Sequence, residues 1–151
     1  MADLAAAIPR GALVGIDTVT FIYHLELAPT YRGIVRPFFT ALERGTFQAV
    51  TSVMTLLEIA VRPLQLQRPD IADDYELLLL EYPNLRVCGI DSEIARRAAE
   101  LRAQYRVDVA DSLQLATALK AGASLFVTND RRLARVSGIG VLLLDTFRGS
   151  P

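Results

Sequence analysis

Hydrophobic residues along the chain fall into two patterns, short apolar runs and longer stretches in which apolar residues recur with helical spacing. The short runs predict strands near residues 12–16, 46–51, 85–90, 124–128 and 140–144. The helical spacing predicts helices over residues 19–27, 34–44, 53–61, 71–81, 92–105 and 111–121. Because strands alternate with helices or helix pairs, we expect an α/β fold with a mostly parallel sheet covered by helices on both faces.

Two of these helices also carry end signals. Asp91 directly precedes the helix expected over residues 92–105 and is well placed to cap it, and Gly122 follows the helix over residues 111–121. No linker, repeat or low-complexity tract divides the chain, and its 151 residues suffice for one domain. We therefore treat residues 1–151 as a single domain.

Two predicted strands deliver an acid to their carboxyl ends. ALVGID, residues 12–17, ends on Asp17, and LFVTND, residues 125–130, ends on Asp130, while Thr51 and Ser52 end a third strand. Open parallel sheets bind ligands at the carboxyl ends of their strands, so both acids are expected at one edge of the sheet. Each acid is equally suited to cap the helix that follows it.

Two further acids share helix faces with apolar side chains. Glu58 lies between Met54 and Val61, and Asp111 leads Leu115 with the same helical spacing. A carboxylate on a core-facing stripe is unfavourable unless a cation meets it, and that cation is either an arginine or a metal ion. Taken together, Asp17, Glu58, Asp111 and Asp130 fit one shared cation better than four separate explanations.

The ligand inventory limits the cation. His24 and Cys88 are the only histidine and cysteine, which excludes a zinc site built on these residues. Carboxylate oxygens select Mg²⁺ or Mn²⁺. Neither an EF-hand calcium loop nor a GxxxxGK[ST] phosphate loop occurs.

Composition narrows the setting of this site. Apolar residues make up 52% of the chain, yet no apolar run approaches the roughly 18 residues of a membrane span. The single cysteine cannot form an internal disulfide and the start, MADLAAAIPRGALVG, lacks the features of a secretory signal, so a cytoplasmic protein is expected. Fifteen of the 16 basic residues are arginine, whose planar guanidinium suits phosphate. A bias in genome composition explains the same skew.

The segments GIDTVTFIY, SVMTLLEI, DVADSLQLATAL and FVTNDRRL, in that order, resemble the PIN domain family, the metal-dependent nuclease fold of VapC-type toxins. The resemblance runs over about residues 14–145 and matches Asp17, Glu58, Asp111 and Asp130 to the four acids of the family. It implies a three-layer α/β/α sandwich around a five-stranded parallel sheet. It also implies a ribonuclease that hydrolyses RNA phosphodiester bonds with Mg²⁺ or Mn²⁺, forms a homodimer and binds a small antitoxin protein.

The chain departs from the family pattern at two places. The family commonly has a further small polar residue after the first acid and its threonine, where this chain has Val19 and carries its next hydroxyl on Thr20. Many members carry a further aspartate and an aromatic residue after the fourth acid, where this chain has Arg132 and Leu133. A metal position that depends on that extra aspartate is therefore not expected in this chain.

Other residues near the four acids have expected supporting roles. Thr18, Thr128 and Asn129 are expected to orient the ligands or a bound water. Arg131 and Arg132 are expected to contact RNA phosphates, although arginines on a solvated face have the same pattern.

Two other classes of protein share some of these features. Response-regulator receivers and aspartyl phosphatases have strand-end aspartates on a similar sheet, but they use a lysine beside the phosphoryl group, and Lys120 lies near a helix end. A binding module for RNA or protein that keeps the PIN fold without catalysis is the main alternative. Against this alternative, a module without catalysis has no need to keep four carboxylates whose burial is energetically unfavourable. Asp108 is a nearby spare carboxylate that we expect to be a helix cap or a surface residue rather than a ligand.

Overall fold

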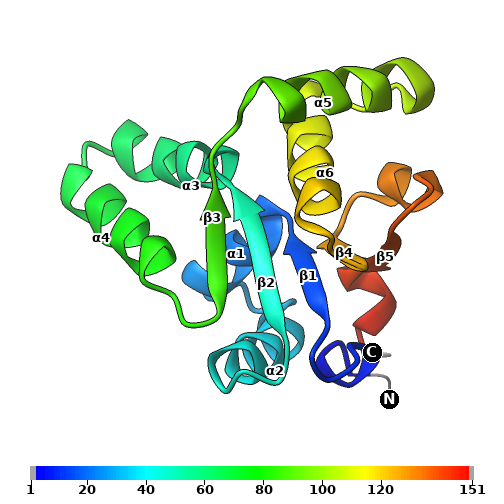
Figure 1. Cartoon of the computed structure of the whole chain (residues 1–151). Helices are drawn as coiled ribbons and strands as arrows, with labels where there is room; N and C mark the ends of the chain where they lie inside the picture. Colours follow the sequence, from blue (N-terminus) through cyan, green and yellow to red (C-terminus); the bar gives the residue numbers. More distant parts are fainter. Residues whose placement is uncertain (1–2, 150–151) are drawn as a thin grey trace.

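The computed structural model describes residues 3–149 and contains a five-stranded sheet in which every pair of neighbouring strands is parallel (Figure 1). Its strands are β1 (Leu13–Ile16), β2 (Gln48–Ser52), β3 (Leu85–Cys88), β4 (Leu125–Thr128) and β5 (Gly140–Leu143). They lie in the order β3-β2-β1-β4-β5. All five predicted strands are confirmed, and the sheet is entirely parallel.

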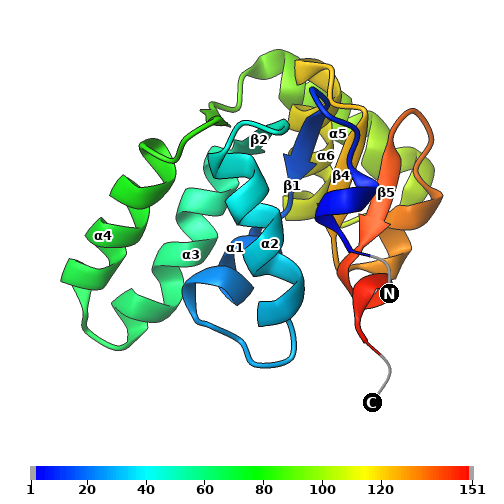
Figure 2. The same cartoon turned by 90° about the horizontal axis from the view of Figure 1, so that it is seen from below.

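Helices cover both faces of this sheet (Figure 2). One face carries α1 (Thr18–Leu25), α2 (Arg32–Glu43), α3 (Val53–Gln65) and α4 (Pro69–Leu80), and the other carries α5 (Ser92–Tyr105) and α6 (Val109–Ala121). Short 3-10 helices span Ala5–Ala7, Arg131–Arg135 and Leu144–Phe147. The predicted three-layer α/β/α sandwich is therefore confirmed. No helix in residues 3–149 is both long and apolar enough to cross a membrane.

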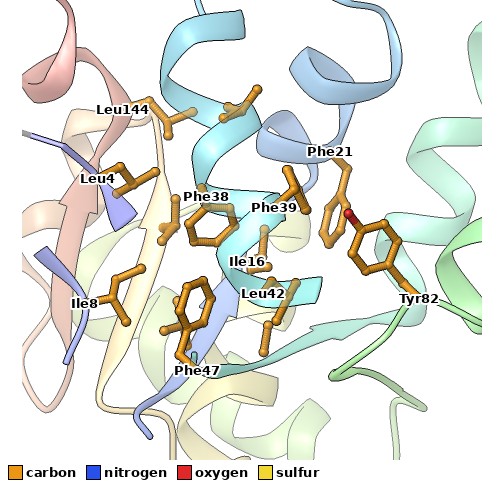
Figure 3. Packing of buried hydrophobic residues seen from close by; sticks show 14 of the residues in the cluster. Leu4, Ile8, Ile16, Phe21, Phe38, Phe39, Leu42, Phe47, Tyr82 and Leu144 are labelled. Atoms are coloured by element: carbon orange, nitrogen blue, oxygen red, sulfur yellow. The ribbon is translucent and has the colours of Figure 1, made fainter. Parts of the chain in front are cut away.

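The two cores follow from the alternation of side chains along the strands. In β1, Val14 and Ile16 point into the core beneath α1 to α4, which is rich in phenylalanine (Figure 3). Val50 of β2 and Phe126 of β4 point into the core beneath α5 and α6. On that side Gly15 allows close helix approach, since a Cβ there would lie 2.6 Å from the Cβ of Ala118. The sheet is thus buried on both sides, as parallel sheets require.

Aspartates and a glycine set the helix ends. Asp91 accepts a hydrogen bond from the Ile94 backbone N–H at 2.9 Å and caps α5, as predicted. Gly122 ends α6 with a positive φ of 84°, a conformation in which glycine has no steric penalty. Asp108 caps α6, also as predicted, with its carboxylate accepting from the Asp111 N–H at 3.3 Å.

Five of the six predicted helices differ from the structure at their boundaries by one to four residues, and only the helix over residues 92–105 has the predicted bounds. Helix α3 continues to Gln65, whereas the prediction ended it at residue 61, before Pro63. Pro63 lies buried in the last turn of α3, although a proline inside a helix removes a backbone donor and crowds the carbonyl four residues earlier. Helix α6 begins at Val109 rather than at Asp111, because the cap at Asp108 starts the helix earlier.

Candidate active site

The two strand-end acids lie at the point of the sheet where the order of the strands reverses, between β1 and β4. The chain builds β1, β2 and β3 toward one edge, then crosses over through α5 and α6 to add β4 on the other side of β1. Strands β1 and β4 are therefore neighbours although more than 100 residues separate them, and Asp17 and Asp130 follow them. Such a switch point is where open α/β sheets bind ligands.

Asp17 is a buried carboxylate held by two hydrogen bonds. Its side chain is 8% exposed and accepts from the Thr18 N–H at 2.8 Å and the Thr128 hydroxyl at 2.7 Å. Burial raises the pKa of Asp17 above its ordinary value, and the charges of Glu58 and Asp130 act in the same direction, against the two hydrogen bonds. Asp17 also caps α1, so the capping role and a place at the sheet edge coexist.

Asp111 lies in the first turn of α6, beside the same edge. Burial is the largest cause that raises the pKa of Asp111 to about 8, followed by a hydrogen bond with Asp108. The negative charges of Asp17, Asp108 and Asp130 raise it further. Acids from β1, α6 and the end of β4 therefore share one electrostatic environment.

Asp130 is paired with an arginine of its own segment. Arg132 donates to it from Nη2 at 2.7 Å and from Nε at 3.0 and 3.2 Å, and the Arg132 backbone N–H adds a bond of 2.9 Å. The Arg132 side chain is the main cause that holds the pKa of Asp130 below its usual value. Asp108 and Asp111 are close enough that their charges also stabilise the Arg132 cation. The residue by which this chain departs from the family pattern thus places a positive charge at the acidic edge.

Glu58 reaches the site through a hydroxyl. The Thr18 hydroxyl donates a hydrogen bond of 2.7 Å to the Glu58 carboxylate. The negative charge of Glu58 raises the pKa of Asp17. Glu58 is only partly buried, and it also lines a groove with Ile22 and Arg62. The structure therefore places Asp17, Asp111 and Asp130 close enough for their charges to interact, and it places Glu58 at their border.

A buried polar network beneath the acids was not foreseen from the sequence. Gln114 donates to the hydroxyls of Thr18 at 3.0 Å and Thr55 at 2.7 Å, and its carbonyl accepts from the Ser52 hydroxyl at 2.9 Å. Gln114 is 2% exposed, so its amide cannot bond to solvent water, and these hydrogen bonds satisfy it instead. The network fixes Thr18 and hence Glu58. The one feature of the sequence that indicates this network is Gln114 itself, a polar residue on the buried face of a helix, three residues after Asp111.

The donor set fits a hard divalent cation. In residues 3–149, no lysine or arginine lies within 4.0 Å of the carboxylates of Asp17, Glu58 or Asp111. Buried carboxylates without a cationic partner are unfavourable, and oxygen ligands suit Mg²⁺ or Mn²⁺. Within the same residues, however, no three acidic, histidine or cysteine side chains are arranged to hold one ion as they stand. For Asp130 to serve as a ligand, Arg132 would have to release it.

An open hollow gives access to these acids. Asp17 and Asp130 line it together with Tyr23, Asn129 and Arg131. Asn129 does not face a carboxylate: its amide donates to the Tyr31 hydroxyl at 3.1 Å and accepts from the Asp145 N–H at 3.0 Å. Arg131 is exposed at the rim.

Thr20 does not take the place of the missing polar residue. Its hydroxyl is fully buried and has no hydrogen-bond partner among the described residues. The hydroxyl groups that contact the acids are instead those of Thr18 and Thr128.

The sequence of this chain matches the model of one protein family. A family model described as the PIN domain matches residues 14–139, most of the chain. A comparison with curated protein sequences found no match.

Several solved structures have a similar fold. A VapBC2 complex from Rickettsia felis, bound to a DNA fragment from its promoter, contains a chain with a TM-score of 0.68 and 15% identity, covering 87% of this chain and 98% of that one. DNA-bound VapBC from Salmonella typhimurium gives a TM-score of 0.66 at 21% identity, covering 89% and 98%. VapC20 of Mycobacterium tuberculosis, a sarcin-ricin loop cleaving toxin, gives 0.62 at 14% identity, covering 76% and 87%.

Proposed function

We propose that this chain, which belongs to the PIN domain family, is a divalent-metal-dependent endoribonuclease and the toxin of a toxin-antitoxin pair. One observation carries the proposal: acids from three separate elements share the switch point of the sheet, and three of the four candidate ligands have no cationic partner within residues 3–149. A cytoplasmic location accords with this role.

In this proposal Asp17, Glu58, Asp111 and Asp130 hold Mg²⁺ or Mn²⁺. When bound, the cation supplies Lewis-acid polarisation of the scissile phosphate and makes a water nucleophilic near neutral pH. The protein positions the ligands: Thr128 and the start of α1 fix Asp17, and Gln114 acts on Glu58 through Thr18. Asp111, with its raised pKa, gives up its proton on binding the ion.

RNA is the proposed substrate on grounds of charge and of family. The 17 acidic residues less the four ligands leave 13, against 16 basic residues, so the protein outside the metal site carries a net positive charge that favours a polyanion. The structurally similar VapC20 is a sarcin-ricin loop cleaving toxin. Arg131 lines the hollow that opens onto Asp17 and Asp130, where a phosphate would approach.

The proposed partner is a small antitoxin protein, since several similar folds were solved as toxin-antitoxin complexes. Exposed apolar side chains on two neighbouring helices support such a contact. Leu57, Val61 and Leu64 follow each other on one side of α3 and are 42–57% exposed, and Leu77 and Leu80 of the adjacent α4 are 56% and 54% exposed. We assign this face to the antitoxin.

We also propose that the chain forms a homodimer. Light scattering of the purified chain, which measures its mass in solution, tests this proposal.

The experiment that tests the proposed function is RNA cleavage. We expect the purified chain to cut members of a broad pool of RNAs, including folded tRNA and ribosomal fragments, with Mg²⁺ or Mn²⁺ and to stop when a chelator is added. Intact RNA throughout, from protein shown to bind the metal, would favour the non-catalytic binding module. The contact between Arg132 and Asp130 is the observation that keeps this second candidate open, because it places an arginine against one proposed ligand.

Arg131 and Arg132 give a prediction about RNA binding. If both contact phosphates once Arg132 has left Asp130, replacing both with alanine should flatten the dependence of log affinity on log salt by about one to two units, at about 0.7 per contact for single strands. Fluorescence anisotropy with a single-stranded RNA over a range of salt concentrations measures this slope. An unchanged slope in a folded variant would assign both arginines to structure alone.

A further inference from the structure

A pair of stacked tyrosines borders the acidic hollow. Tyr23 of α1 and Tyr31, just before α2, have ring centres 4.0 Å apart and an interplanar angle of 1°. Figure 2 shows α1, α2 and the loop that joins them. Tyr23 is partly exposed and lines the same hollow as Asp17 and Asp130. The partly exposed Tyr23 ring thus packs against the core and borders the hollow beside the acids.

Contacts on Tyr31 fix this stack in place. The Tyr31 hydroxyl donates to Asp145 at 2.7 Å and accepts from the Asn129 amide at 3.1 Å. The hydrogen bond to Asp145 is the main cause that raises the pKa of Tyr31, so this hydroxyl stays neutral. The Arg148 guanidinium lies 5.9 Å from the Tyr31 ring centre. Because Asn129 directly precedes Asp130, the stack is connected to the acidic edge through one residue.

Tyr23 itself has a different environment. Tyr31 covers one face of its ring, and Tyr23 also lines an apolar cleft with His24, Val35 and Arg36. The Tyr23 ring is stacked on Tyr31 through one face and borders an open hollow, so it is suited to stack with a second flat group. Next to carboxylates that we propose to bind a cation, and to Arg131 at the rim, the flat group that arrives with a phosphate is an unpaired nucleobase.

We propose that Tyr23 is the base-stacking platform of this site and that Tyr31 and Asn129 position it. This inference rests on the proposed function and deepens it: the substrate is RNA with an unstacked base beside the cleaved phosphate. Base-aromatic stacking tolerates every base, so Tyr23 selects unpaired structure rather than sequence.

The first experiment reports stacking without catalysis. The chain contains no tryptophan, so Tyr23→Trp introduces a single indole fluorophore whose emission a stacked base quenches. Combined with Asp17→Asn, which prevents consumption of the RNA, this variant should be quenched by a single-stranded RNA decamer in the presence of Mg²⁺. An abasic phosphodiester chain of equal length and charge should leave the emission unchanged. Equal responses to both chains, or binding of the decamer without quenching, would overturn the proposal.

The second experiment uses cleavage and separates the inference from the proposed function. With a mapped cleavage site, an abasic nucleotide next to the cut should raise the KM of the wild-type chain about 5- to 150-fold, the range that one base stack is worth. Tyr23→Phe keeps the ring and should show the same penalty, whereas Tyr23→Ala should show almost none. An equal abasic penalty in all three proteins would refute the role of Tyr23 while leaving the ribonuclease intact. Absence of cleavage by every protein would refute the proposed function, and the fluorescence result would still decide the stacking.

Discussion

Replacing Asp17 by asparagine should abolish metal-dependent RNA cleavage while leaving the fold intact. The amide keeps an oxygen that accepts from the Thr18 N–H and is as good a helix cap as aspartate, so α1 still begins at Thr18. What is lost is the charge of the most buried of the four acids. Loss of an outer-shell partner typically lowers activity or metal affinity about 10- to 100-fold, and loss of a direct ligand should exceed this.

The matched control for this change is Asp91→Asn. Asp91 caps α5 as Asp17 caps α1, but it pairs with Lys120 and does not contact the acidic site. Initial rates of cleavage of one RNA at saturating Mn²⁺ should fall below about one hundredth of wild type for Asp17→Asn and stay near wild type for Asp91→Asn. Comparable rates for Asp17→Asn and wild type would mean that Asp17 only caps α1.

Replacing Asp111 by asparagine should stabilise the metal-free protein at alkaline pH. The pKa of Asp111 is about 8 in the folded state, well above the unfolded value of about 3.9. Between these two values the folded state binds more protons than the unfolded state, so the free energy of unfolding falls as the pH rises. The contribution of Asp111 is fully present below about pH 4 and is lost by about pH 8.

Thermal unfolding in chelator at several pH values measures this effect. Asp111→Asn should melt at or above the wild-type temperature at pH 8 to 9, with a difference that shrinks toward pH 5. Addition of Mn²⁺ should stabilise the wild type more than the variant, because a ligand at 100 times its Kd contributes about 2.7 kcal/mol and the variant binds it more weakly. A structural ion pair at Asp111 predicts the opposite, a loss of about 3 to 5 kcal/mol in chelator and an unchanged response to metal.

The sequence predicted the sheet because its strands are short apolar runs that need burial on both faces. The positions of Asp17 and Asp130 followed, since parallel strands bring their carboxyl ends to one edge whatever their order. Helical spacing placed Glu58 and Asp111 on inward faces, and the structure finds both partly buried there. These features depend on periodicity and direction, which are local properties of the sequence.

Other features of the site depend on which elements meet, and no local pattern encodes that. Gln114 was not predicted as a site residue because its partners come from α1, β2 and α3. The stack of Tyr23 on Tyr31 depends on the path of the loop between α1 and α2. The pairing of Arg132 with Asp130 spans only two residues, but it occurs in a 3-10 turn for which helical spacing gives no guide.

Calorimetric titration of Mn²⁺ into the metal-free protein near pH 7.5 tests the central claim most directly, that these carboxylates form a cation site. Titrations in buffers of different ionisation enthalpy give both the number of ions bound and the number of protons released. We predict saturable binding of one or two ions with release of a proton, because Asp111 is largely protonated below its pKa of about 8 and must ionise to bind. Asp111→Asn should bind more weakly and release fewer protons. Absence of binding to the folded wild-type chain, or binding that is identical in Asp17→Asn and Asp111→Asn, would contradict the assignment.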